Sequence, residues 1–160
     1  MLFRKKNLFF FTSIIAIVLV SIGCSSNSSF NEPKDVVIGM FGAMERNDKA
    51  ALAHILDLDE LMKIASTDYA LNSDNPRVFN SPLDILEDLT DEGYTKTKWF
   101  SYQRIVNKQE IFEETATVEV TFMDKKLSKA YLVKFGVHIK NDKWKIYSFN
   151  ILSGSRNENN

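Results

Sequence analysis

Histidine is the side chain best suited to proton transfer near neutral pH, and this sequence contains two, His54 and His138. His54 falls in a short predicted helix. His138 falls in a predicted strand, where alternation puts it on the same face as Lys134 and Lys140, opposite the apolar face. The two histidines show no metal-ligand spacing, so we predict no metal site, no cofactor and no catalytic role for either residue.

Carboxylates gather at two places, and paired carboxylates can act as acid and base when their surroundings separate their pKa values. Both clusters fall at predicted helix ends or on polar helix faces, so we expect them to be solvated surface groups. The first cluster is Asp57, Asp59 and Glu60; the second is Glu87, Asp88, Asp91 and Glu92. The sequence has no Gly-rich phosphate loop, nucleophile elbow or zinc-protease motif. It therefore carries no catalytic signature.

The single cysteine, Cys24, stands directly after an apolar N-terminal stretch. Basic residues at positions 4–6 precede that stretch, which covers residues 8–22, and this order is typical of a secretory signal peptide. The stretch is shorter than the about 20 apolar residues that a membrane-spanning helix needs. A lone cysteine also excludes a disulfide within one chain. We therefore predict a cleaved signal peptide over residues 1–23.

Residues 20–24, Val-Ser-Ile-Gly-Cys, resemble the lipobox of bacterial lipoproteins, although Ser21 stands where that motif usually has leucine. The resemblance implies a diacylglycerol on the Cys24 sulfur, cleavage after Gly23, and stable anchoring in the bilayer by two or three acyl chains. Residues 24–32 would then be a flexible tether on the extracytoplasmic face of a bacterial cell membrane or outer membrane. The alternative is an uncleaved N-terminal anchor.

The charge balance argues against nucleic acid as a partner. The chain has a formal net charge of −1, and removal of the basic leader leaves 17 basic against 21 acidic residues, a net charge of −4. Non-specific nucleic-acid binding depends on a basic surface, which this composition does not supply.

The mature chain divides into a helical half, residues 33–94, and a strand-rich half, residues 100–152. Helical apolar spacing and helix-start signals predict four helices, which begin at Pro33, Lys49, Asp59 and Pro82. Residues 72–80 are polar and predict a loop. Gly93 is expected to end the fourth helix.

Apolar and polar residues alternate over residues 116–122 and 131–139, which is the pattern of half-buried strands. Asn141-Asp142 predicts a tight hairpin into a strand that starts at Trp144, and an earlier strand is expected over residues 101–112. Helices grouped before strands predict an α+β domain over residues 33–152, with N-terminal helices packed on a four-stranded antiparallel sheet. Residues 153–160 are expected to be a disordered tail.

Two segments are similar to the nuclear-transport-factor-2-like (cystatin-like) superfamily, and within it to small bacterial lipoproteins of unknown function. The first is residues 33–48, with Pro-Lys-Asp-Val-Val, Phe-Gly-Ala-Met and Asn-Asp; the second is residues 133–146, with Val-Lys-Phe and Asn-Asp-Lys-Trp-Lys-Ile. The resemblance implies a curved sheet wrapped by helices into a cone with a cavity. It implies no activity, because that fold hosts enzymes, binding modules and scaffolds.

Apolar side chains could line such a cavity or simply fill the core between sheet and helices. The candidate lining residues are Phe41, Met44, Trp99, Tyr102, Phe122, Phe135 and Trp144. The first functional hypothesis is an anchored, non-catalytic domain that binds a small apolar ligand or an envelope protein. The second is an isomerase or dehydratase, which needs an ionisable group inside the cavity. The third is a scaffold of a secretion or conjugation apparatus, which the Cys24 lipobox disfavours.

Overall fold

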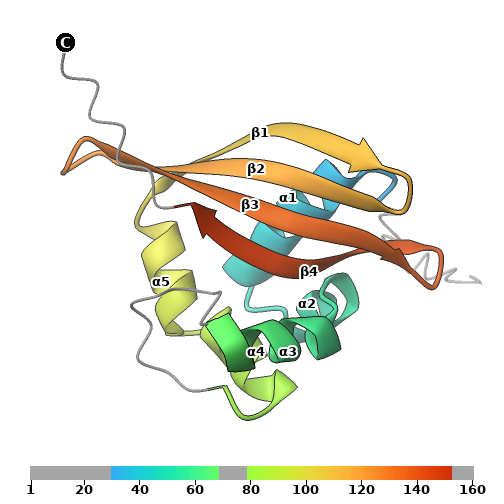
Figure 1. Ribbon diagram of the computed structural model, residues 1–160. Helices are drawn as coiled ribbons and strands as arrows, with labels where there is room; N and C mark the ends of the chain where they lie inside the picture. The colour runs from blue at the N-terminus through green and yellow to red at the C-terminus, as the bar shows by residue number, and fades with distance from the viewer. Residues whose placement is uncertain (1–29, 69–78, 153–160) are drawn as a thin grey trace, which may run out of the picture.

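The fold is an α+β arrangement in which helices precede an open antiparallel sheet, as the sequence predicts. The computed structural model describes residues 30–68 and 79–152, and within them five helices are followed by four strands in the order β1-β2-β3-β4 (Figure 1). The signal peptide, Cys24, most of the tether and the predicted tail lie outside the described residues.

Helix α1, Pro33–Glu45, begins with proline in its first turn. Backbone N–H groups there have no partner within the helix, so the missing N–H of proline costs no hydrogen bond. Its side chains at helical spacing are fully or almost fully buried against the sheet: Val36, Val37, Met40, Phe41 and Met44. The predicted helix start at Pro33 is confirmed, and α1 is the main link between the helical layer and the strands.

Helix α2, Lys49–Ile55, starts at the predicted residue. Asn47 takes a left-handed backbone conformation that ends α1, and the Asp48 carboxylate accepts a hydrogen bond of 2.9 Å from the N–H of Ala51. Helix α3, Leu58–Asp68, begins one residue before the predicted start. Helix α4, Pro82–Asp88, begins as predicted, and the Asp84 carboxylate accepts from the N–H of Ser81 at 2.9 Å.

The prediction that Gly93 ends the fourth helix is wrong. Helix α4 ends at Asp88, the left-handed residue is Asp91, and Gly93 is instead the N-cap of a further helix, α5, Tyr94–Phe100. A Cβ on Gly93 would collide with the carbonyl of Asp88. Glycine is therefore needed here for a close approach between two backbone segments.

The four strands form one meander: β1 Gln103–Phe112, β2 Thr115–Asp124, β3 Lys129–Lys140 and β4 Lys143–Leu152. Asn141 and Asp142 both have positive φ, as a two-residue hairpin turn with the twist of the sheet requires. All four predicted strands and this hairpin are confirmed. Figure 1 shows helices α2 to α5 gathered on one side of the sheet.

The space between the sheet and the helices is occupied by aromatic rings. The Trp99 ring lies 5.3 to 6.0 Å, between centroids, from the rings of Phe41, Phe122, Phe135 and Phe149. All five side chains are less than a tenth exposed. The contacts of Trp99 with Phe41, Phe135 and Phe149 are edge-to-face, and such contacts add to the stabilisation that burial gives. The core is therefore closed around Trp99, which comes from the helix that the sequence did not predict.

Within residues 30–68 and 79–152, no helix combines the length and the apolar character that crossing a membrane requires.

Candidate functional site

A surface hollow of about 880 Å³ lies outside α1, bounded by α2 and by the hairpin between β3 and β4. This volume falls in the range of ligand-binding pockets. Its lining mixes apolar, small and charged residues: Phe30, Asn31, Ile38, Gly39, Gly42, Arg46, Asp48, Ala51, His54, Ile55, Asp142, Lys143 and Trp144. The hollow is the first candidate functional site.

The hollow lies beside a face of α1 that carries two glycines, Gly39 and Gly42. Ile38, Gly42 and Arg46 are four residues apart and form one stripe, away from the buried stripe that meets the sheet. The Phe30 ring occupies the space that a Cβ on Gly39 would need. The only neighbour that a Cβ on Gly42 would meet is the end of the Arg46 side chain.

Charged residues of both signs, called the rim below, line the hollow together with apolar and small residues, called the floor. Lys143 Nζ lies 3.3 Å from His54 Nε2. Asp48 already serves as the N-cap of α2, whereas Arg46 and Asp142 make no ion pair within the described residues. The rim therefore offers cationic donors and one uncommitted carboxylate to a bound molecule.

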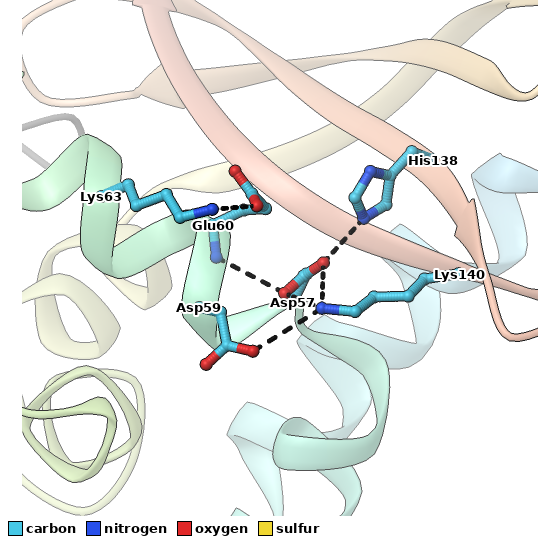
Figure 2. A network of polar contacts seen from close by, with 6 residues as sticks. All are labelled: Asp57, Asp59, Glu60, Lys63, His138 and Lys140. Carbon is cyan, nitrogen blue, oxygen red and sulfur yellow. Dashed lines mark hydrogen bonds and ion pairs between the residues drawn. The ribbon is translucent and has the colours of Figure 1, made fainter.

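A second cluster, the Asp57 network, joins the start of α3 to β3 (Figure 2). Lys140 Nζ donates to both oxygens of the Asp57 carboxylate at 2.8 Å, and His138 Nε2 lies 2.9 Å from one of them. The N–H of Glu60 points to the same carboxylate at 3.4 Å, and Asp59 lies 3.7 Å from Lys140. His138 and Lys140 share a face of β3, as alternation predicts.

Two opposing effects set the pKa of Asp57. Burial raises the pKa of this carboxyl, but hydrogen bonds from Lys140, from the N–H of Glu60 and from His138 together hold it below its ordinary value. The same hydrogen bond to Asp57 raises the pKa of Lys140. Both groups therefore stay charged through the neutral range.

The Asp57 network connects the segment between α2 and α3 to strands β3 and β4. The N–H of Asp57 donates to the carbonyl of Ile146 at 2.8 Å, and Leu56 forms a parallel bridge with Ile146 on the edge of β4. The His138 ring also stacks on Tyr147, with 4.8 Å between centroids. Neither Asp57 nor His138 lines the hollow. The network therefore holds the α2–α3 junction against the sheet.

The prediction that both acidic clusters are solvated is wrong at one residue in each. Asp57 is 3% exposed, because the sheet edge and Lys140 cover it, while its neighbour Asp59 stays open to solvent. Asp88 is 0% exposed, because α4 ends against the start of α5, where the N–H of Thr95 faces it at 3.4 Å. Asp91 is exposed and pairs with Lys49 at 3.0 Å.

The seven candidate pocket residues are divided between core and surface. Phe41, Met44, Trp99, Phe122 and Phe135 are buried in the core, and the Tyr102 ring packs near its margin, 6.4 Å from Phe122. Trp144 lines the hollow, and the other six are not among the residues around it. Of the two histidines, His54 lies at the hollow and His138 in the Asp57 network.

Sequence reasoning missed most of the hollow, including Ile38, Gly42, Arg46 and Lys143. One sequence signal was available: Ile38 is a large apolar residue that falls outside the helical stripe predicted to be buried, and in the structure it is 50% exposed. Within the part of the chain that the structure describes, no group of three or more His, Cys, Asp and Glu side chains is placed to hold a metal ion.

The sequence matches no protein-family model, and no curated protein is significantly similar to it.

Proposed function

We propose that this chain is an exported bacterial lipoprotein whose single domain binds a ligand or an envelope partner without catalysis. Residues 1–23 are the signal peptide, Cys24 carries the lipid, and the domain faces away from the cytoplasm. The support for the anchor is the order of basic residues, apolar stretch and cysteine in the sequence. A nuclear-transport-factor-2-like cone is the finer description of the fold that we propose.

The hollow outside α1 is the observation that carries the binding role. It has the volume of a ligand site, an exposed apolar side chain in Ile38, and polar groups around its rim. The interior under the sheet is a poorer candidate, because Trp99 and the phenylalanines around it are already packed against one another. Binding is therefore assigned to the surface of the domain.

An enzyme is the second candidate, and the Asp57–His138 pair is the observation that favours it. A buried carboxylate that orients a histidine is a common device for general-base catalysis. Here, however, Lys140 occupies both carboxylate oxygens and the pair lies away from the hollow. These features favour a structural role for the pair.

The anchor is tested with Cys24→Ser in the full chain. We expect the unsubstituted protein to sediment with membranes and its mature mass to fit cleavage before Cys24 plus a diacylglycerol. The variant should lose the lipid and should no longer be cleaved before residue 24. Retention of the variant in membranes, with cleavage at the same bond, would contradict the anchor.

The binding role is tested by capture from detergent-treated envelopes with the lipidated protein. Ile38→Asp should lose the captured species. Leu83→Asp is the matched control, because Leu83 on α4 has a similar exposure of 54% but does not line the hollow. Equal capture by both variants would show that the hollow is not the binding site.

A further inference from the structure

We propose that the hollow binds a phospholipid from the membrane that holds the protein, with an acyl chain on the apolar floor and the phosphate group at the rim. This inference rests on the proposed function only for the position of the hollow near a membrane. The binding itself depends on residues that the structure describes. Membrane anchoring and lipid binding can therefore fail separately.

The length of the tether places the hollow close to the bilayer. Phe30 lines the hollow and packs on Gly39, and it follows Cys24 by six residues. A chain of that length spans at most about 20 Å when fully extended. With Cys24 acylated, the hollow stays within that distance of the lipid surface, where the effective concentration of phospholipid is high.

The floor of the hollow suits an acyl chain. Ile38 is half exposed in the free protein, and Trp144 presents an amphipathic ring of the kind that favours membrane interfaces. Gly42 and Ala51 line the same hollow with almost no side-chain volume, and the Phe30 ring covers Gly39. A bound chain would remove Ile38 from water, which is the driving force for binding at this site.

The rim suits a zwitterionic headgroup. Arg46 and Lys143 are donors to a phosphate, and Arg46 has no ion pair within the described residues. Asp142 supplies a carboxylate for a headgroup amine, and Asp48 is held as a helix cap. Charges of both signs beside an apolar floor match a molecule that carries a phosphate, an amine and an acyl chain.

The test uses the full chain with Cys24→Ser and a lysophosphatidylethanolamine with a brominated acyl chain, below its micelle concentration. Bromine quenches tryptophan on contact, and the chain has two tryptophans, Trp144 in the hollow and Trp99 in the core. We expect saturable quenching that Trp144→Phe abolishes. Ile38→Asp should weaken the apparent affinity by about tenfold or more, while Leu83→Asp should leave it unchanged.

A second probe separates headgroup recognition from general apolar binding. Arg46→Gln should weaken binding of the lysophospholipid but leave a brominated long-chain alcohol unaffected. The proposal is overturned if Ile38→Asp binds the lysophospholipid as the parent chain does, or if quenching persists in Trp144→Phe. It is also overturned if the hollow captures an envelope protein and no lipid. Failure of membrane anchoring alone would overturn the proposed location and leave the lipid site standing.

Discussion

The two faces of α1 contrast sharply in what they contact. Toward the sheet the helix buries Met40, Phe41 and Met44 among aromatic rings, and toward the hollow it presents Ile38, Gly42 and Arg46. The first face is closed and supplies stability. The second leaves apolar surface and charged groups in contact with solvent, which is how binding sites differ from cores. One face of α1 therefore packs in the core, and the other lines the hollow that we propose as a binding site.

The largest expected effect is a loss of stability in the core between α1 and the sheet. Phe135→Ala removes a fully buried ring that contacts Phe41, Trp99 and Phe149. We expect the free energy of unfolding to fall by about 3–5 kcal/mol, measured by urea denaturation. A loss below about 1 kcal/mol would mean that the interior is not packed as described.

Asp57→Ala should have the next largest effect, because it releases the α2–α3 junction from β3. We expect a loss of about 2–3 kcal/mol at neutral pH, since a buried, hydrogen-bonded carboxylate is removed. Asp59→Ala is the control: its side chain is 80% exposed and should cost under about 1 kcal/mol. Similar losses of stability in the two variants would contradict the role of Asp57 in holding the α2–α3 junction against the sheet.

The pH dependence of stability follows from the same residue. The folded pKa of Asp57 lies below its unfolded value, so its contribution is complete above the unfolded pKa of about 4 and is lost as pH falls through the folded pKa. In Asp57→Asn, unfolding measured between about pH 5 and 2 should show a shallower loss of stability than in the parent chain. A parallel curve would show that Asp57 is not the group responsible.

Gly42→Ala should stabilise the domain. Alanine restores helix propensity worth about 0.5–1 kcal/mol, and its Cβ would meet only the movable end of Arg46. Thermal unfolding measures the gain. Gly93→Ala is the contrasting case, since its Cβ would collide with the Asp88 carbonyl and should destabilise the fold.

The smallest effect on stability is expected for Ile38→Asp, within about 0.5 kcal/mol, since Ile38 lies outside the core. The same variant is expected to weaken lipid binding at the hollow by about tenfold or more. A large loss of stability would place Ile38 among the core residues and weaken the contrast between the two faces.

Local patterns were sufficient to predict α1, α2 and the strands, because Pro33, the α1 stripe and the alternation over residues 116–139 act within a few positions of one another. Helix α5 escaped prediction because its seven residues show only one repeat, Thr95 and Trp99, on a buried face. The burial of Asp57 depends on Lys140, which is 83 residues away, and no local pattern reports such a contact.

The most direct test of the account compares the two tryptophans in the lipidated protein. Acrylamide quenching would be measured in Trp99→Phe and Trp144→Phe, in phospholipid vesicles and after the proteins are dissolved in a steroid detergent that carries neither an alkyl chain nor a phosphate. We predict that Trp144, in the hollow, is shielded in the vesicles and becomes accessible in the detergent, whereas Trp99, in the core, is shielded in both. Equal accessibility of Trp144 in vesicles and detergent, or a change at Trp99, would contradict the division between a closed core and a lipid-binding surface.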